Sequence, residues 1–491
     1  MKLRKLIEGS GAGRIAHLPE IDIKAVSTNS KAIKKGSLFV AIKGFKMDGR
    51  NFLKEAFLHG AEAAVVQGKI KKPGNSRNII TVRDARKAVS VIAKNFYKSP
   101  SERLKTVGIT GTNGKTTIAL LVESMLRGCG VPCGIIGTIE YRFGRDRISA
   151  ERTTPDALLL NSLLDRMLKQ KAEAVVMEVS SHALCQGRVD NIFFDAAIFT
   201  NLTREHLDYH GNIENYFKSK MRIFRRLKKN GIAIINADDK KAVRMEKILK
   251  CKKITYGLKK RAALTGIVKK LDVNGSSFDV RLRKKYVFSI DTKLVGLHNI
   301  SNILAASALG LSFGLDPLSI KEGIERVKAV RGRLEPVGTG GRDFSVFVDY
   351  AHTHDALENV LKFLNHAGTG KIITVFGCGG ERDRGKRPLM GRIAQDLSDF
   401  SVITNDNPRG ESPEKIVREI EKGMDRKKRN YTVALNRKKA IEIALKKAGK
   451  DDIVLLAGKG HETEQVLRRR KIFFNDKKTA EDILAGPYFR K

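Results

Sequence analysis

The stretch that most constrains this chain runs from Val107 to Leu120, VGITGTNGKTTIAL: an apolar strand-like run, a glycine turn and the start of a helix. Glycines let a backbone turn tightly with its N–H groups directed at an anion, and the helix N-terminus adds positive potential. Lys115 can reach the β- and γ-phosphates of a nucleotide, and the hydroxyl of Thr116 can bind Mg²⁺. The pattern therefore predicts a phosphate-binding loop.

This loop is shorter than the common phosphate-binding sequence, because Ile109 stands where that sequence has its first glycine. The string that is present consists of Gly111, Thr112, Asn113, Gly114, Lys115, Thr116 and Thr117. A plain glycine turn is the competing interpretation. The preceding strand, the lysine and the two threonines together favour a nucleoside triphosphate site.

Length and composition indicate a globular protein of several domains. The 491 residues are too many for one core and predict about three domains. Hydrophobic residues make up 41%, and no run approaches the roughly 18 apolar residues of a membrane span. The start, MKLRKLIEGSG, lacks the apolar core of a signal peptide, so we expect the cytoplasm. Five scattered cysteines without a C-x-x-C pair indicate reduced, mostly structural thiols.

The net charge of +41 raises nucleic acid, anionic lipid or an acidic small molecule as partners. The basic residues are spread over predicted helix faces such as 240–253 and 437–450, and the chain has no Trp. Polynucleotide sites combine basic residues with aromatic ones. We therefore expect a lysine-rich solvated surface and no nucleic-acid partner. Separately, we expect no membrane span and a monomer.

Alternating strand and helix signals predict an α/β fold with mostly parallel sheets and helices on both faces. A basic patch at 98–105 and a turn at 330–336 mark boundaries between three domains, 1–102, 103–330 and 331–491. The predicted strands cover 36–42, 63–66, 107–110, 134–137, 174–179, 196–200, 231–235, 344–348, 372–376, 402–404 and 452–456. The predicted helices cover 52–59, 115–128, 156–170, 214–228, a stretch from about 299, 355–366, 388–397, 413–424 and 437–447. Residues 251–290, rich in Val, Thr and Gly, predict a short antiparallel excursion.

Polar clusters follow several of these strands, at the edge where open α/β sheets bind ligands. Glu178 ends the apolar run from Ala174, a usual place for a carboxylate that holds Mg²⁺. A helix-capping acid is the alternative there. His206 follows another strand among Asn, Glu and Asp, and the ligand and structural interpretations are equally supported. Lys220 shares a helix face with aromatic residues, but the pattern alone does not separate it from Lys218.

Four polar loops follow strands of the third domain. Asp349 and His352 end one strand, and Gly377 to Pro388 carries glycines and several basic residues suited to an anion. The other two loops are 405–410 and 458–462. Arg409 beside Asn407 can clamp a carboxylate, and Glu462 can receive an ammonium group. A site that holds a carboxylate and an amine at once indicates an amino-acid substrate.

These motifs together resemble the Mur ligase family, ATP-dependent amide-bond-forming enzymes of peptidoglycan synthesis, and most closely those that add the third residue of the peptide stem. The match covers nearly the whole chain. It is carried by 111–117, 153–155, 177–182, 201–208, 216–224, 298–302, 331–333, 349–352, 377–388 and 458–462. The tetrad D-N-P-R at 406–409 looks like the signature of members that add meso-diaminopimelate instead of L-lysine.

The resemblance implies a small N-terminal α/β domain that binds UDP-muramoyl dipeptide, a central P-loop ATP-binding domain with a parallel sheet, and a C-terminal Rossmann-like domain that binds the amino acid. Lys115, Thr116, Glu178 and His206 would serve ATP and Mg²⁺. Lys220 matches the family lysine that is carbamylated, and a carbamate supplies oxygen ligands. Further nucleotide contacts would come from Asn299, Asn302, Arg333 and Asp349. The UDP-muramoyl dipeptide would contact Ser30, Thr153, Thr154, Ser180, Gln186 and Arg188. Diaminopimelate would contact Arg382, Asp406, Asn407, Pro408, Arg409, Gly458 and Glu462. Catalysis would rest on Lys115, Lys220, His206 and Arg333.

Three departures from the family pattern stand in the chain. Asn29-Ser30-Lys31 replaces the common D-S-R, Arg152 replaces the usual Asn before T-T-P, and His354 replaces the usual Pro. The first two concern the UDP contacts. Three alternatives stay open at this stage: an L-lysine-adding member, a ligase similar to folylpolyglutamate synthetase, and a basic P-loop protein that binds nucleic acid.

Overall fold

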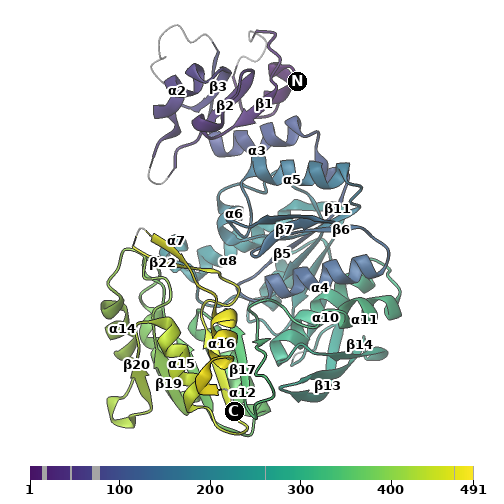
Figure 1. Ribbon diagram of the computed structural model, residues 1–491. Helices are drawn as coiled ribbons and strands as arrows, with labels where there is room; N and C mark the ends of the chain where they lie inside the picture. Colours follow the sequence, from purple (N-terminus) through teal and green to yellow (C-terminus); the bar gives the residue numbers. More distant parts are fainter. Residues whose placement is uncertain (14–18, 45–46, 69–77, 260, 469, 490–491) are drawn as a thin grey trace.

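The computed structural model of the protein describes residues 1–13, 19–44, 47–68, 78–259, 261–468 and 470–489 (Figure 1). Three sheets of four, eleven and six strands organise these residues, and a two-stranded hairpin accompanies the third sheet. They follow one another along the chain, from the N-terminal unit at the top of Figure 1 to the C-terminal unit at the lower left. The predicted α/β class with mostly parallel sheets is confirmed.

The N-terminal unit is a small parallel sheet with three helices. Its strands, in spatial order, are β1 (Ala25–Ser27), β2 (Ser37–Ala41), β3 (Ala61–Gln67) and β4 (Ile79–Val82). The helices are α1 (Leu3–Ile7), α2 (Leu53–Leu58) and α3 (Ala85–Phe96). Helix α3, absent from the sequence prediction, packs against α5 (Ala157–Lys169) and so joins this unit to the central one (Figure 1). Asn191 adds a hydrogen bond of 3.1 Å to Ser90 across the same junction.

The central sheet has the order β15-β14-β13-β12-β11-β10-β5-β9-β6-β7-β8. Seven adjacent strands, from β13 to β6, are mutually parallel, and antiparallel strands extend both ends of the sheet. The strands are β5 (Lys105–Thr110), β6 (Cys133–Ile136), β7 (Glu140–Phe143), β8 (Asp146–Ser149), β9 (Ala174–Glu178), β10 (Phe194–Phe199), β11 (Leu227–Asn236), β12 (Lys252–Gly257), β13 (Leu264–Asp272), β14 (Gly275–Leu282) and β15 (Lys285–Thr292). The antiparallel excursion expected within 251–290 is present as β13 to β15.

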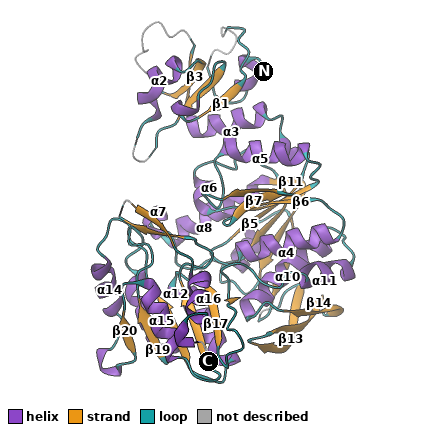
Figure 2. Ribbon diagram, viewed as in Figure 1, coloured by secondary structure: helices purple, strands orange, loops and turns teal. Residues whose placement is uncertain are grey.

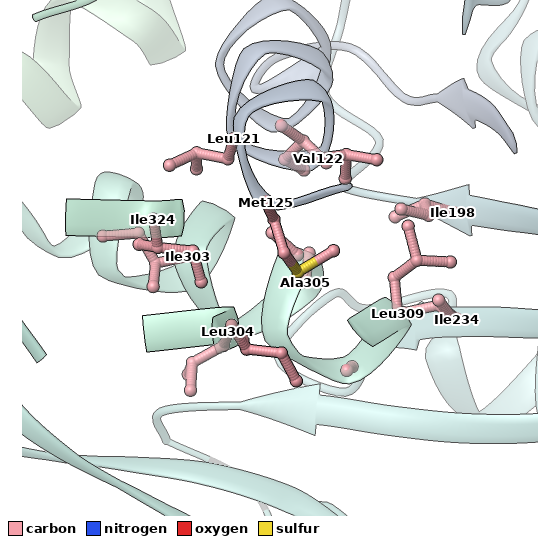
Figure 3. Close-up of a cluster of buried hydrophobic side chains, with 14 of the residues drawn as sticks. Leu121, Val122, Met125, Ile198, Ile234, Ile303, Leu304, Ala305, Leu309 and Ile324 are labelled. Carbon is pink, nitrogen blue, oxygen red and sulfur yellow. The ribbon is translucent and has the colours of Figure 1, made fainter. Parts of the chain in front are cut away.

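Helices cover both faces of this sheet, as expected. The central helices are α4 (Lys115–Gly128), α5, α6 (Ser181–Cys185), α7 (Leu207–His210), α8 (Ile213–Met221), α9 (Ala242–Ile248), α10 (Leu297–Ser312) and α11 (Pro317–Glu325). Figure 3 shows Met125 of α4 among side chains of α10 and α11, with Ile198 and Ile234 of the sheet beside them. A second core fills the opposite face and includes side chains of α5, α9, β9 and β10. Burial on both faces fixes β5 and its loop in place.

The C-terminal sheet has the order β16-β17-β21-β18-β19-β20, in which all strands except the short β16 run parallel. Its strands are β16 (Glu335–Pro336), β17 (Ser345–Asp349), β18 (Ile372–Phe376), β19 (Phe400–Ile403), β20 (Tyr431–Val433) and β21 (Ile453–Ala457), and the hairpin is β22 (Glu464–Leu467) and β23 (Arg470–Phe473). Figure 2 shows helices flanking this sheet: α12 (His354–Ala367), α13 (Lys386–Leu397), α14 (Pro413–Glu421), α15 (Arg437–Lys447) and α16 (Asp476–Leu484). Because the strands are parallel, the four polar loops predicted here meet at one edge.

Two helix predictions extended too far. The helix expected over 214–228 ends at Met221, and after a 3₁₀ turn the chain enters β11 at Leu227. Within 240–253 only Ala242–Ile248 is helical, and β12 begins at Lys252. Lys253 donates to the carbonyl oxygens of Glu246 and Leu249 and so satisfies the end of α9. In both segments ladder pairing in the sheet overrides helix propensity.

Two expectations about the whole chain can be checked on the described residues. No helix among them is both long and apolar enough to cross a membrane. All five cysteines are free thiols, in agreement with the expected reduced state.

Candidate functional site

The predicted phosphate loop joins β5 to α4, and the helix begins at Lys115 as expected. Both loop glycines are required by their surroundings. Gly111 has φ +148°, and a Cβ there would lie 1.8 Å from Thr200 Oγ1. Gly114 has φ +86°, and its Cβ would lie 2.4 Å from Asn302 Oδ1. The loop is therefore pressed against β10 and α10, and only glycine fits at either position.

Two lysines converge on this loop from different helices. Lys115 Nζ donates to the carbonyl oxygens of Gly111 (2.9 Å) and Thr112 (2.7 Å). Lys220 Nζ donates to the same Gly111 oxygen at 2.8 Å and lies 4.4 Å from the ring centroid of Tyr216. Lys220 is 1% exposed, whereas Lys218 faces solvent, so the structure separates the two lysines that the pattern left open.

Burial lowers the pKa of Lys220 well below its ordinary value, and the positive charge of Lys115 lowers it further. Burial also lowers the pKa of Lys115. Two ammonium groups that share one acceptor oxygen repel each other in a desolvated site. The arrangement therefore favours an uncharged amine at Lys220.

Glu178, at the end of β9, lies beside the loop. Its Oε2 accepts hydrogen bonds from Thr116 Oγ1 (3.0 Å) and Thr138 Oγ1 (2.9 Å), and its Oε1 accepts one from the backbone N–H of Thr138 (2.8 Å). The structure thus brings Thr116 and Glu178 together as predicted. Thr138 was not predicted, because it follows a strand end that carries no acidic or basic signal.

His206 precedes α7 on the loop after β10, with a left-handed backbone at φ +54°. Its ring contacts His182 at a centroid distance of 4.7 Å, and its Nε2 lies 3.7 Å from Glu205 Oε1. Burial lowers the pKa of His206 to about 4, so the imidazole is neutral near pH 7 and can act as a ligand.

The described residues contain no cluster of three or more His, Cys, Asp or Glu that could hold a metal by itself. Mg²⁺ does not need one, because it is held by one or two protein oxygens together with phosphate oxygens and waters. Thr116 and Glu178 offer such oxygens next to the phosphate loop. The residues present therefore fit a Mg²⁺ ion that a bound nucleotide completes.

A cavity of about 920 Å³ opens from the phosphate loop between the central and C-terminal units. Tyr256, His298 and Phe363 contribute ring surfaces to its wall. Seven predicted nucleotide-binding residues line it: Asn113, Gly114, Thr117, Asn299, Asn302, Arg333 and Asp349. The cavity belongs in the size range of ligand sites and joins both units.

Two of these lining residues come from the C-terminal unit. Asp349 accepts hydrogen bonds from the backbone N–H groups of Leu334 and Ala351, both at 2.7 Å. Burial raises its pKa, while the charge of Arg333 acts in the opposite direction. The Arg333 guanidinium lies 4.7 Å from the ring centroid of Tyr350, which holds it against the cavity wall.

The predicted UDP-muramoyl residues of the central unit form one cluster. Thr154 Oγ1 donates to the Glu178 carbonyl oxygen (2.8 Å) and accepts the N–H of Ser180 (3.0 Å). Arg188 donates to the Thr154 carbonyl oxygen (2.8 Å) and, through Nη2, to Gln186 Oε1 (2.6 Å). Thr153 joins through Thr138 Oγ1 at 3.1 Å. Ser30 lies in the N-terminal unit, where its carbonyl oxygen contacts His59 Nδ1.

The predicted amino-acid residues also gather at one place, the loops after β18, β19 and β21. A Cβ on Gly379 would lie 3.0 Å from Arg409 Nη1 and 3.6 Å from Arg382 Cγ, so this glycine stands between two guanidinium side chains. Burial and the charge of Arg382 lower the pKa of Arg409. Two close arginines form a natural site for an anion.

Glu462 lies on the loop after β21. Its Oε2 accepts Asn407 Nδ2 and Lys459 Nζ, both at 2.8 Å. The Asn407 amide oxygen accepts the N–H of Val466 at 2.9 Å, so Asn407 holds Glu462 in place instead of presenting a free amide. Asp406 Oδ2 would lie 3.0 Å from a Cβ on Gly458, and Gly380 packs on the carbonyl of Pro408. Lys459 is buried and was not predicted.

Glu205 and His352 were also missed as partners, and they join the central and C-terminal units. His352 Nε2 and Glu205 Oε1 are 3.1 Å apart, and His352 Nδ1 lies 2.8 Å from the carbonyl oxygen of Tyr350. Burial raises the pKa of Glu205, but the His352 hydrogen bond and the charges of His206 and Lys115 outweigh it and hold that pKa below its usual range. The motif containing Glu205 was recognised, yet nothing in it signals a partner 147 residues away.

Family comparisons match three consecutive parts of the chain. Residues 22–97 match the Mur ligase family catalytic domain, 109–310 match the Mur ligase middle domain, and 332–460 match the Mur ligase glutamate ligase domain. These stretches coincide with the three sheets.

Curated relatives and solved structures agree with this result. A UDP-N-acetylmuramoyl-L-alanyl-D-glutamate--2,6-diaminopimelate ligase from Caldanaerobacter subterraneus is 41% identical over 486 residues, 99% of each chain. A solved structure with the same enzyme name is 30% identical, with a TM-score of 0.67 and coverage of 94% of this chain and 95% of that one. The MurF ligase from Thermotoga maritima in complex with ADP shares the fold at 19% identity, with a TM-score of 0.66 and coverage of 90% and 96%.

Proposed function

The chain belongs to the Mur ligase family, and from this premise we propose that it is an ATP-dependent ligase that joins meso-2,6-diaminopimelate to UDP-N-acetylmuramoyl-L-alanyl-D-glutamate. The observation that carries the choice of amino acid is that Arg382 and Arg409 flank Gly379, while Glu462 lies on a neighbouring loop and accepts a hydrogen bond from Asn407. Diaminopimelate differs from lysine by a second carboxylate, and two guanidinium groups suit that carboxylate.

ATP is proposed to lie in the cavity between the central and C-terminal units, with its phosphates on the loop 111–117. Lys115 and the N-terminus of α4 would attract the phosphates. Asn299, Asn302, Asp349 and Arg333 would contact the rest of the nucleotide or close over it. The ADP bound to a family member of the same fold supports this assignment.

Mg²⁺ is proposed to bind at Thr116 and Glu178, with His206 and a carbamate on Lys220 serving a second ion. Bound Mg²⁺ would neutralise phosphate charge and so lower the barrier for attack by another anion. The protein's own residues act alongside it: Glu178 is fixed by two threonine hydroxyls, and Lys115 supplies a positive charge from the loop.

The reaction has two chemical steps. The γ-carboxylate of the D-glutamyl residue attacks the γ-phosphate of ATP, the bond to ADP breaks, and an acyl phosphate forms. The amine of diaminopimelate, after losing a proton, then attacks the acyl carbon and expels phosphate, which leaves an amide. Closure of the C-terminal unit on the central unit would align these groups and exclude water.

The environment of Lys220 supports the proposed carbamate. An uncharged amine attacks carbon dioxide, forms the N–C bond and releases one proton, and the resulting carbamate is an oxygen donor. The lowered pKa of Lys220 favours the uncharged amine, and burial would protect the product from water. Lys218, in solvent, offers neither condition.

The UDP-muramoyl dipeptide is proposed to lie between the N-terminal and central units, on Thr153, Thr154, Ser180, Gln186 and Arg188, with Ser30 across from them. This placement leads the D-glutamyl carboxylate toward Glu178 and the phosphate loop. The units 1–102, 103–330 and 331–491 would thus bind the dipeptide nucleotide, ATP and the amino acid respectively.

A substrate screen tests the proposal. Purified protein is expected to release phosphate from ATP only when both the nucleotide dipeptide and an amino acid are present, and to turn over diaminopimelate faster than L-lysine. Preference for lysine would contradict the proposed binding of a carboxylate by Arg409 and favour an L-lysine-adding member of the family. If phosphate release without either substrate equals the release with both, the ligase assignment is wrong.

The same assay separates the remaining alternatives. A ligase similar to folylpolyglutamate synthetase would accept glutamate with a folate, whereas residues 22–97 match an N-terminal Mur domain. A nucleic-acid-dependent ATPase would be stimulated by polynucleotide with a steep salt dependence. ATP dependence favours the cytoplasm as the compartment. A monomer is expected, and sedimentation of the purified protein checks it.

A further inference from the structure

A buried ion pair lies directly beneath the amino-acid loops. Arg437 begins α15 and Asp476 begins α16, and both side chains are 0% exposed. Arg437 Nε donates to Asp476 Oδ1 and Nη2 donates to Asp476 Oδ2, each at 2.7 Å. This two-pronged pair fixes the orientation of the guanidinium plane.

The same guanidinium reaches two strand ends. Arg437 Nη2 donates to the carbonyl oxygen of Ala457 at 2.9 Å, and Nη1 donates to that of Asn405 at 3.3 Å. Ala457 ends β21 and directly precedes Gly458, and Asn405 directly precedes Asp406. One side chain therefore holds the first residues of two separate loops of the proposed amino-acid site.

The two strands involved are not neighbours, because β18 lies between β21 and β19. Strand pairing therefore sets the distance between the loops after β21 and β19 only indirectly, through β18 and the glycine that follows it. A Cβ on Gly377, just after β18, would lie 2.1 Å from the carbonyl oxygen of Thr404, so the backbones are already in contact there. Gln465 Nε2 adds a hydrogen bond of 2.8 Å to the Asp406 carbonyl oxygen. The hydrogen bonds of Arg437 to Ala457 and Asn405 add a direct link between the two strand ends.

The charge of Arg437 also acts on the site. Burial lowers its pKa, but Asp476, Asp406 and Glu462 outweigh burial and keep it a cation. Asp476 is fully buried and balances that charge. Asp406 and Glu462 thus lie within electrostatic reach of a buried positive charge.

We propose that Arg437, held by Asp476, is a positioning residue for the added amino acid: it sets the spacing of the 405–410 and 458–462 loops and so the distance between Arg409 and Glu462. The inference rests on the proposed function, since it takes these loops as the amino-acid site. Arg437 touches no reacting atom in this scheme, and its effect passes through backbone carbonyls.

The test compares Arg437→Lys and Asp476→Asn with wild type. Lysine keeps the charge but loses the fork, and asparagine keeps the shape but loses the pairing charge. Lys477→Ala is the matched control, because Lys477 sits next to Asp476 on α16 but binds Glu335 of β16 (2.8 Å) instead of the two strands that carry the amino-acid loops. Apparent KM for each of the three substrates, kcat and thermal unfolding are measured on all four proteins. Acyl phosphate formed without amino acid is trapped with hydroxylamine.

Arg437→Lys is expected to raise the KM for diaminopimelate about tenfold or more, with the other two KM values within about twofold. Trapped acyl phosphate should stay at the wild-type level, and Lys477→Ala should match wild type throughout. Folded variants with an unchanged KM for diaminopimelate would overturn the inference, and so would equal rises in all three KM values. If Asp476→Asn does not fold, Arg437→Lys alone decides. Failure of wild type to use any amino acid would instead contradict the proposed function.

Discussion

At the scale of single residues, the shared oxygen of Gly111 explains why Lys220 matters. Lys115 and Lys220 both donate to this oxygen, so repulsion disfavours the state in which both are cations. Lys220→Ala is expected to lower kcat by about 100-fold or more, the cost of losing one charge-stabilising group. Added formate or acetate should restore part of the activity, because a small carboxylate can occupy the place of the proposed carbamate.

Lys218→Ala is the control, since Lys218 lies two residues away and faces solvent. It should retain wild-type activity and show no response to formate. A fully active Lys220→Ala variant would reject the carbamate.

The phosphate loop allows a second prediction at this scale. Gly111→Ala places a methyl group 1.8 Å from Thr200 Oγ1, so the loop must move away from β10. We expect the dissociation constant for ATP, measured by calorimetry, to rise about tenfold or more. Gly130→Ala is the control: Gly130 also has a left-handed backbone, φ +77°, but a Cβ there would have no atom within 4 Å.

That control separates backbone strain from loop displacement. Gly130→Ala should cost about 1 kcal/mol of stability and leave ATP binding unchanged. Equal ATP affinity in Gly111→Ala and wild type would mean that the loop adapts and the glycine is not required.

At the scale of elements, Arg387 of α13 ties together the β18 loop and α14. Its buried guanidinium donates to Glu411 and Glu419 and to the carbonyl oxygen of Gly379. The Arg387 hydrogen bond lowers the pKa of Glu411 from 4.5 to about 2. A carboxyl group with a lowered pKa stabilises the fold at pH values above its pKa in the unfolded state. This stabilisation is lost as the pH falls from about 4.5 toward 2.

Glu411→Gln should therefore be less stable than wild type near neutral pH, by at most ~3 kcal/mol for a shift of this size. The difference should shrink below pH 4.5 and vanish near pH 2. Urea unfolding across this range measures it. A difference that stays constant with pH would assign the effect to packing instead of charge.

Elements with local signals were predictable. Helix α4 matches its predicted bounds because the glycine turn and Lys115 mark its start. Helix α15 matches as well, since Asn436 caps it and its apolar residues recur at helical spacing. Strands β7 and β8 were not predicted, because β8 reads Asp-Arg-Ile-Ser and shows no apolar alternation. Their pairing with β6 supplies what the local pattern lacks.

At the scale of the whole molecule, Glu205 and His352 join the central unit to the C-terminal one. A hydrogen bond to a charged group contributes about 1.5–3 kcal/mol. In a double-mutant cycle on kcat/KM, Glu205→Gln and His352→Gln should therefore show a coupling of roughly 10- to 150-fold.

Arg204 and Asp383 provide a matched control across the same junction. Their charged atoms are 3.9 Å apart and the Arg204 side chain is 51% exposed, so their coupling should stay below about 1 kcal/mol. Additive effects of Glu205→Gln and His352→Gln would show that the contact does not serve closure.

The candidate site illustrates what a sequence reveals and what it withholds. Glu178 was recognisable because it ends a strand, and Arg409 because it lies in the loop after one, and parallel strands bring their ends together. Contacts between units, such as Glu205 with His352, depend on how two sheets meet. No periodicity along either segment encodes that meeting. Buried supports such as Arg437 and Lys459 were missed because a single basic residue in a lysine-rich chain carries no local signal.

The phosphate loop and the proposed amino-acid loops stand on the strand ends of two different sheets. Under the proposed assignment, a change at Arg382, Arg409 or Glu462 would therefore alter the amino acid that is added without changing the residues that bind ATP. In this arrangement, the choice of amino acid and the binding of ATP depend on separate sheets. Under the same assignment, a few substitutions in the loops of one sheet would change the composition of the product, while the ATP-binding unit stays unchanged.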